Sequence, residues 1–389
     1  MPPAVIPLLV LCLLLSCPPE SVSRAVPRDH RQEEAAIAVP ANSSSSHNAT
    51  WRAFERFLDM ERGSHSSGVA ELKSYFHRFG YLPSNLSVGT PSGSTPSGGG
   101  SGVNFTDAFD ERLESAVALY QSNLGLPVTG KLDAATLAQV MSPRCGVDDR
   151  GMRRHGRRAV RRYNFFPGQP TWARARPMTL TYAFSQADLV DYLPRGEVEG
   201  AFRRAFARWA AVIPVTFVEV GEYWTANIKV GFYEGDHGDG EPFDGVLGVL
   251  AHAFSPENGR LHLDAAETWA VDFGQEGSKV AVDLESVATH EIGHALGLGH
   301  SSTKDAIMYP SLSPRTRKVD LRVDDVEGVQ ALYGSNPSFQ LDSLLASETS
   351  SAITGPGPGR SKKRTQNLGV AFLGALAALC TLLLLLLLL

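Results

Sequence analysis

The chain has 389 residues, of which 43% are hydrophobic and 20% charged, and its formal net charge is −5. This length allows two domains with additional tails, and the composition is that of a globular protein rather than of a disordered or fibrous one. A mildly acidic balance argues against a nucleic-acid partner.

Residues 1–23 are predicted to be a secretory signal. An early apolar run, "PPAVIPLLVLCLLL", is followed by small residues and a cut near Ser23, although the usual basic start is missing. The alternative is a disordered apolar leader, and residues 24–49 are a polar linker. Export agrees with four N-x-[ST] triplets, which are acceptors for glycosylation, at Asn42, Asn48, Asn85 and Asn104.

Residues 50–162 are expected to form one domain, in which residues 50–141 carry helical patterns and predict a small all-α bundle. Apolar residues recur at helical spacing over residues 51–63, 69–82, 105–126 and 131–141. A Gly/Ser-rich insertion, "GTPSGSTPSGGGSG", interrupts them as a flexible loop. The arginine cluster at residues 150–162 predicts a loop that a basic-specific protease cuts after Arg162, with polyanion binding as the alternative.

Residues 163–334 have a different pattern, which predicts an α+β domain. β-branched and aromatic residues predict strands over residues 178–184, 215–220, 227–233 and 248–254. A helix over residues 195–212 has Val198, Phe202, Phe206 and Trp209 on one face. Two more helices are expected, at about residues 280–296 and at 323–334. The expected architecture is therefore a mixed, twisted sheet with three helices packed on it.

The C-terminal part consists of a linker at residues 335–367 and an apolar segment at residues 368–389. A small-residue stretch, a basic patch and a terminal apolar run follow in the order of a glycosylphosphatidylinositol (GPI) attachment signal. Ser350 or Ser351 is the predicted attachment residue. The alternative is a transmembrane helix, because the segment is long enough to span a bilayer.

The sequence "HEIGHALGLGH" at residues 290–300 carries the chemistry. On a helix, His290 and His294 lie one turn apart on one face and can bind one metal ion. Gly297 lets the chain leave the helix and bring His300 back as a third ligand. Three imidazoles leave one tetrahedral position open, as in catalytic zinc sites. Glu291 beside the first ligand is the predicted general base.

The longer H-E-x-x-H-x-x-G-x-x-H form, followed by Met308 in "AIMYPSL", resembles the metzincins, and within them the matrix metalloproteinases (matrixins). The resemblance covers about residues 51–334. It implies a methionine turn beneath the metal, a preference for an apolar residue after the cut, and a helical propeptide similar to peptidoglycan-binding modules. Carbohydrate binding by this propeptide is a minor alternative.

The resemblance explains the single interior cysteine, Cys145 in "SPRCGVDD". Matrixin propeptides carry a switch in which the thiolate fills the open zinc position and keeps the enzyme latent. Arg144 and Asp149 match the ion pair that braces the switch, whereas Asp148 replaces a proline. Because aspartate is charged and more flexible than proline, we expect the Cys145 segment to be held less firmly than in other members. After cleavage, Tyr163 would pair its amino group with Asp324 or Asp325.

Residues 237–267 match two further metal sites of the family. Four side chains correspond to ligands of a closed structural zinc site: His237, Asp239, His252 and His262. Oxygen donors correspond to a calcium site, namely the side chains of Asp244, Asp264 and Glu267 and the carbonyls of Gly245, Leu247 and Val249. The alternative is a polar surface loop.

The sequence departs from most animal members in this region. The loop between His252 and His262 is shorter and lacks a Gly-Gly-Asp segment, and Asn227 stands where an aspartate is common. We therefore expect no second calcium site there. With the "YNFFPGQPTW" start and no hemopexin-like pattern after Gly334, these features resemble the plant-type matrixins.

Together these patterns predict a secreted, latent zinc endopeptidase, a monomer with zinc and calcium, anchored to the outer face of the plasma membrane or present in the extracellular matrix. Its partners would be protein or peptide substrates and an activating protease. Two alternatives remain: a catalytically silent, metal-stabilised binding module at the cell surface, and a different metzincin.

Overall fold

The computed structural model describes residues 53–83, 104–152, 163–341 and 344. Several predicted features lie outside these residues: the signal segment, the linker, Asn42, Asn48, Asn85, the cleavage site at Arg162, Ser350 with Ser351, and the apolar tail. Among the residues described, no helix is both long and apolar enough to cross a bilayer.

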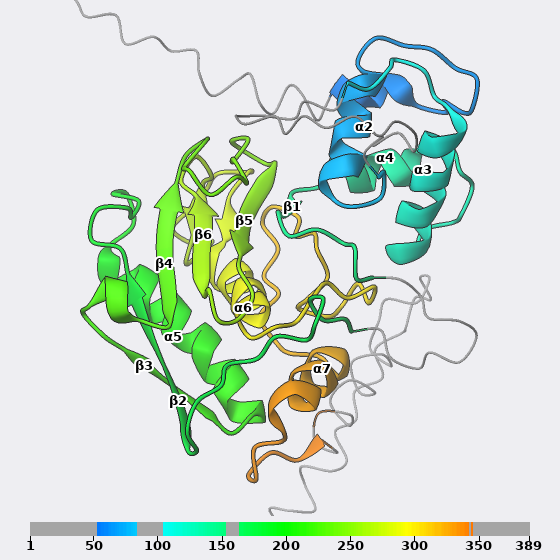
Figure 1. Ribbon diagram of the computed structural model, residues 1–389. Coiled ribbons are helices and arrows are strands. Elements are labelled where there is room, and N and C mark those ends of the chain that lie inside the picture. The colour runs from blue at the N-terminus through cyan, green and yellow to red at the C-terminus, as the bar shows by residue number, and fades with distance from the viewer. Residues whose placement is uncertain (1–52, 84–103, 153–162, 342–343, 345–389) are drawn as a thin grey trace, which may run out of the picture. The chain divides into compact units, whose positions relative to one another are not determined.

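The N-terminal part is helical, as predicted, and its α-helices are labelled in Figure 1. Its elements are η1 (Ala53–Phe57), α2 (Val69–Arg78), α3 (Glu111–Asn123) and α4 (Ala134–Val140). Their own core includes Phe57, Phe76 and Tyr120, which are completely buried.

All four helices are shorter than the sequence pattern indicated, and the first and third differ from it most. Over residues 51–63 the described part forms only η1, and Asp59 soon afterwards has a left-handed φ of 60°. The third helix begins at Glu111 rather than near residue 105, because Asp110 caps it by accepting a hydrogen bond of 2.9 Å from the backbone N–H of Leu113.

The second part contains a mixed sheet, in agreement with the α+β prediction. Its strands are β2 (Met178–Phe184), β3 (Val215–Glu219), β4 (Ile228–Tyr233), β5 (Val249–Ala253) and β6 (Arg260–Asp264), joined at one edge by β1 (Arg144–Cys145). The order is β1-β5-β6-β4-β2-β3, and neighbouring strands are parallel except for β5 and β6.

Four short elements and the strand β6 were not predicted. β1 comes from the N-terminal part and pairs with β5, which leaves β5 with a neighbour on each side. A separate two-stranded sheet pairs β7 (Trp269–Ala270) with β8 (Val282–Asp283), and η2 (Tyr223–Thr225) precedes β4. Such pairings of two or three residues leave no periodic signal in the sequence.

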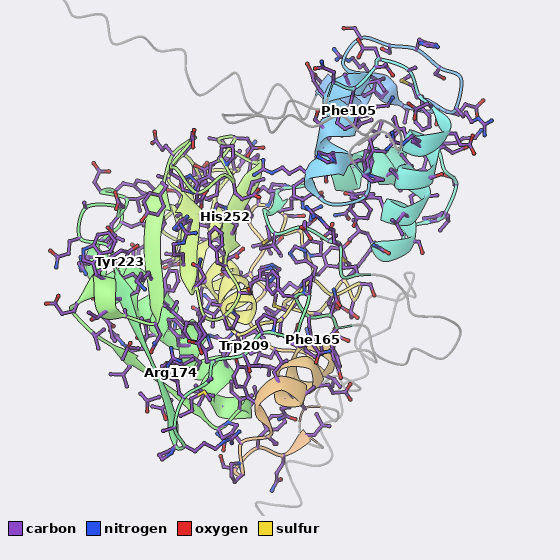
Figure 2. All side chains as sticks on the ribbon, in the orientation of Figure 1. Phe105, Phe165, Arg174, Trp209, Tyr223 and His252 are labelled. Atoms are coloured by element: carbon purple, nitrogen blue, oxygen red, sulfur yellow. The ribbon has the colours of Figure 1, made fainter. Side chains whose placement is uncertain are left out.

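The three expected helices are α5 (Arg195–Val212), α6 (Leu284–Ala295) and α7 (Val323–Tyr333). α5 buries the predicted face, namely Val198, Phe202, Phe206 and Trp209. Trp209, labelled in Figure 2, donates its indole N–H to the carbonyl of Thr289 at 2.9 Å. α5 thus fixes α6, all of whose residues are buried, and α6 carries the candidate site.

Candidate active site and metal centres

The site begins with the start of α6. Asp283 accepts a hydrogen bond of 2.8 Å from the backbone N–H of Ser286 and so caps the helix four residues later than the pattern indicated. From there the helix presents His290 and His294 on one face, and their Nε2 atoms are 3.1 Å apart.

The chain then turns sharply at Gly297, which has a φ of 102°. A Cβ there would lie 2.3 Å from the carbonyl oxygen of Pro170, so only glycine fits this position. The turn brings His300 back, with its Nε2 atom 3.2 Å from that of His294. The three predicted imidazoles therefore meet at one point.

The outer nitrogen of each ring is held by an acceptor. The Nδ1 atoms of His290 and His294 donate to the carbonyls of Ile307 and Leu298 at 2.7 and 2.8 Å. Since a carbonyl only accepts, these rings carry their protons on Nδ1 and present bare Nε2 lone pairs to one another. Burial lowers the pKa of both rings well below the usual value, so they are neutral. Converging lone pairs of this kind suit a cation.

Glu291 lies beside these rings and is completely buried. Neither of its carboxylate oxygens has a hydrogen-bond partner among the residues described. Burial raises the pKa of Glu291 to about 8, and the neighbouring Cys145 thiol lowers it by less although it does not meet the geometry of a hydrogen bond. A buried carboxyl group without a partner is costly for a fold, which points to a role in chemistry rather than in stability.

Cys145 completes the set of side chains. Its Sγ atom lies 3.4 Å from Nε2 of His294. One ligand atom each from Cys145, His290, His294 and His300 lies within 4.8 Å of all the others, and all four residues are buried. One sulfur and three imidazole nitrogens form a ligand set that zinc accepts.

Strand pairing holds Cys145 in this position. The backbone N–H groups of Arg144, Cys145 and Gly146 donate to the carbonyls of Gly248, Pro310 and Ala251 at 3.0, 2.8 and 2.8 Å. The segment therefore lies along β5 and along the chain after Met308.

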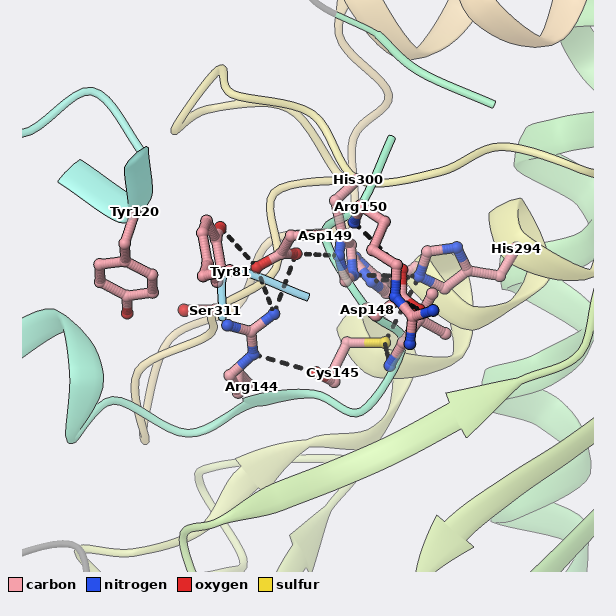
Figure 3. Close-up of polar contacts among 12 residues, drawn as sticks. Tyr81, Tyr120, Arg144, Cys145, Asp148, Asp149, Arg150, His294, His300 and Ser311 are labelled. Carbon is pink, nitrogen blue, oxygen red and sulfur yellow. Dashed lines mark hydrogen bonds and ion pairs between the residues drawn. The ribbon is translucent and has the colours of Figure 1, made fainter. Parts of the chain in front are cut away.

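A buried ion pair braces this segment. The guanidinium of Arg144 donates to both oxygens of Asp149, at 3.0 and 2.9 Å, and both side chains are inaccessible to solvent. Asp149 also accepts hydrogen bonds from the Tyr81 hydroxyl at 2.7 Å and from Nδ1 of His300 at 2.6 Å, as the dashed lines in Figure 3 show. Burial alone would raise the pKa of Asp149, but Arg144 and then His300 lower it to about 2.

The sequence revealed the ion pair but not the contacts of Asp149 with Tyr81 and His300. Those residues are far from Asp149 in the chain, and no local spacing relates them.

Asp148, which replaces a proline, accepts a hydrogen bond of 3.1 Å from the backbone N–H of Arg150 and pairs with its side chain at 2.9 Å. These contacts constrain the turn that the proline would otherwise restrict.

Met308 lies beneath the ligand helix. A Cβ at Gly293 would come within 2.3 Å of the Met308 sulfur and 3.1 Å of the Trp209 ring. The backbone N–H groups of Ile307 and Met308 donate to the Asp325 carboxylate at 2.8 and 3.0 Å. α7 thereby fixes the turn on which α6 rests.

A second set of side chains gathers away from α6. One carboxylate oxygen of Asp239 lies 2.8 Å from a ring nitrogen of each of His237, His252 and His262. One ligand atom of each of these four residues lies within 4.8 Å of the others. Burial lowers the pKa of His252 and of His262 to about 4, so these two rings are neutral. Three imidazoles and one carboxylate suit a closed zinc site.

The acids predicted for calcium are close together but less tightly gathered. Gly245 and Leu247 donate their backbone N–H groups to Asp264 and Glu267 at 3.1 and 2.6 Å, and Val249 donates to Asp244 at 2.7 Å. The carbonyl groups of these residues were the predicted ligands. Burial, followed by repulsion from Asp264 and then from Asp244, raises the pKa of Glu267 to about 9. Burial, followed by repulsion from Asp244, raises the pKa of Asp264 to about 7. A cation would offset this repulsion.

Asn227 has a structural role. Its side-chain oxygen accepts hydrogen bonds from the backbone N–H and the hydroxyl of Thr181 at 2.9 and 3.1 Å. It therefore ties β4 to β2.

Comparisons with known proteins agree with this geometry. Residues 171–334 match the model of the family described as "Matrixin", and residues 65–140 match that of the "Putative peptidoglycan binding domain". The chain is 56% identical to metalloendoproteinase 1-MMP of Arabidopsis thaliana over 78% of this chain and 79% of that relative. It is 53% identical to 4-MMP of the same plant, over 80% and 84% of the two chains, and 46% identical to 2-MMP, over 78% and 80%.

Proposed function

The chain belongs to the matrixin family and is a zinc-dependent endopeptidase, and from this premise we propose which of its residues do the work. His290, His294 and His300 hold the catalytic zinc through their Nε2 atoms. The carbonyls of Ile307 and Leu298 orient the first two rings, and Asp149 orients the third ring in the latent form. The observation that carries the proposal is the convergence of three bare imidazole nitrogens beside a buried carboxyl group without a partner.

When bound, zinc supplies a Lewis acid that polarises the scissile carbonyl and lowers the pKa of water. Glu291 takes a proton from the water that attacks the carbonyl carbon, and gives it to the leaving amine nitrogen as the C–N bond breaks. In the latent form, burial raises the pKa of Glu291 to about 8. Removal of the propeptide admits water and relieves that burial, so Glu291 becomes a carboxylate able to act as a base at neutral pH.

Latency follows from the segment that carries Cys145. We propose that the thiolate occupies the fourth position on zinc. β1 also pairs with β5, so a substrate backbone cannot add to the same edge until β1 leaves. The Arg144–Asp149 pair keeps this segment in place.

Activation requires cleavage of the loop that ends at Arg162, which lies outside the described residues. Cleavage would leave Tyr163 as the new N-terminus. A Cβ on Gly328 of α7 would lie 3.1 Å from Tyr163, so that residue already packs against α7. Of the two predicted partners for the amino group, Asp325 is occupied by three backbone N–H groups and is completely buried in α7, so we favour the less buried Asp324.

The other metals have stabilising roles in this proposal. His237, Asp239, His252 and His262 hold a structural zinc. Asp244, Asp264 and Glu267, with backbone oxygens of the same loop, hold calcium. These ions would fasten the loops that flank β5 within residues 237–267. A disulfide cannot do so, because Cys145 is the only cysteine in the described residues.

We also propose that the protein is secreted as a glycosylated monomer and anchored by GPI near Ser350, with residues 1–23 as signal, 50–162 as propeptide and 163–334 as catalytic domain. Asn104 is the one glycosylation candidate among the described residues, and it is exposed. Release of the protein from cells by a phosphatidylinositol-specific phospholipase tests the anchor, and retention would contradict it.

Peptide cleavage with and without a chelator tests the function. Cleavage that stops with the chelator and returns with zinc is expected. A protein that holds zinc but cuts no peptide after removal of the propeptide would instead be the silent binding module.

A further inference from the structure

A pocket opens beside the candidate catalytic residues. Its lining includes His290 and Glu291, and its walls are mostly apolar, with contributions from Leu250, Val287, Tyr309, Pro310 and Leu312. A pocket next to the residues that act on the scissile bond is where the first substrate side chain after the cut would lie, so this inference rests on the proposed function.

Lys318 lines the same pocket. Its backbone N–H donates to the Ser286 hydroxyl at 2.7 Å, which fixes it against the first turn of α6. Ser286 precedes Glu291 by five residues, and at about 1.5 Å per residue this places the backbone of Lys318 about 7.5 Å along the helix axis from the general base. Lys318 therefore lies at the far side of the pocket from Glu291, where a long substrate side chain ends and a short one does not reach.

The ammonium group of Lys318 has no carboxylate in direct contact with it among the described residues. It donates to the carbonyl of Lys304 at 2.8 Å and lies 5.4 Å from the centre of the Tyr309 ring. Among the described residues no carboxylate oxygen comes within 4.0 Å of it. Burial lowers the pKa of Lys318 to about 8, so the group is still charged at neutral pH. An ammonium carries three protons, and one of them is satisfied by Lys304.

We propose that Lys318 is a specificity-determining residue, and that the pocket accepts glutamate and glutamine after the scissile bond in addition to apolar side chains. The stem of such a side chain would contact the apolar walls, and its terminal oxygen would accept a hydrogen bond from the ammonium. Lysine and arginine would be rejected by the like charge. In the alternative, only the methylene groups of Lys318 contact the substrate, and the pocket distinguishes substrate side chains by their size alone.

The test uses the mature enzyme and one peptide series that differs only after the scissile bond, with leucine, methionine, glutamine, glutamate or lysine there. We expect the glutamate and glutamine peptides to be cut within about tenfold of the leucine peptide, and the lysine peptide to be the poorest. In Lys318→Met, the ratio of kcat/KM for glutamate over leucine should fall by at least about tenfold, since a buried charged hydrogen bond is lost.

Lys304→Met is the matched control. It removes an exposed lysine beside the same pocket but keeps the backbone carbonyl that holds the ammonium. Its ratios should equal those of the unchanged enzyme. Cleavage of the leucine peptide by Lys318→Met shows that the variant is folded. If that variant instead fails to fold, Lys318→Arg, which keeps the charge, should retain the glutamate preference.

The outcomes separate this inference from the function on which it rests. If the unchanged enzyme cuts no peptide of the series, the proposed function fails. If it cuts the leucine peptide but discriminates strongly against glutamate and glutamine, or if Lys318→Met leaves the ratio within twofold, only the role of Lys318 is overturned.

Discussion

The Oδ1 atom of Asp149 lies 2.6 Å from Nδ1 of His300, although the two residues are 151 positions apart in the chain. The carboxylate that braces the Cys145 segment through Arg144 is therefore also the outer partner of a candidate zinc ligand. The Cys145 segment and the metal site share one buried hydrogen-bond network. A substitution in this network should therefore change both the latency of the proform and the geometry of the zinc ligands.

Asp149→Asn should abolish latency. The substitution leaves Arg144 as a buried charge without a counterion, which costs about 3–5 kcal/mol. We expect the proform to cut peptides without proteolytic activation and to unfold at a lower temperature. Asp148→Asn is the matched control, because Asp148 pairs with the exposed Arg150, and exposed pairs contribute about 0–1 kcal/mol. A silent proform of unchanged stability would contradict the role of Asp149.

Tyr81→Phe should loosen the Cys145 segment in the proform without removing the Arg144–Asp149 ion pair. It deletes the hydroxyl that donates to Asp149 at 2.7 Å, and hydrogen bonds to charged groups contribute about 1.5–3 kcal/mol. The rate at which a thiol reagent modifies Cys145 in the proform should rise by about tenfold or more. Tyr120→Phe removes a neighbouring buried hydroxyl that contacts Tyr75 instead, and a similar rise in that variant would refute the effect.

Calcium should stabilise the mature enzyme through Asp244, Asp264 and Glu267. These carboxylates repel one another, and a divalent cation between them removes the repulsion. We expect the melting temperature to rise on addition of calcium and to fall with a calcium-selective chelator. Glu267→Gln should reduce the calcium-dependent part of the shift. A calcium response identical in both proteins would place the ion elsewhere.

The glutamate preference should depend on pH. Burial lowers the pKa of Lys318 to about 8, the carboxyls of Asp325 and Asp305 oppose this shift, and Arg322 adds to it. Above this pH the ammonium loses its charge, whereas the substrate carboxylate stays ionised. The glutamate-to-leucine ratio should therefore fall as the pH rises through about 8, by roughly tenfold per unit. The glutamine-to-leucine ratio should change less, and parallel profiles would count against charge recognition.

Much of the candidate site could be predicted because its ligands follow local rules. The spacing of His290 and His294 matches one helical turn, and a glycine was required where Gly297 turns the chain. The face of α5 that ends at Trp209 was equally clear from its period.

The rest depends on contacts between distant segments. The pairing of β1 with β5, the hydrogen bond of Tyr81 to Asp149 and the position of Lys318 in the pocket join residues with no sequence spacing in common. The helix starts at Asp110 and Asp283 were missed for a different reason. Apolar spacing continues before both residues, and the capping hydrogen bonds decide where the helix begins.

The most direct measurement compares the mature enzyme with its Glu291→Gln variant, determining zinc content and kcat/KM for one peptide in the same preparations. We expect both proteins to retain zinc bound by the three histidines and the variant to lose activity by about 10²–10⁴-fold, the contribution typical of a general base. Full proteolysis by the variant, or an active enzyme without stoichiometric zinc, would contradict the proposed mechanism.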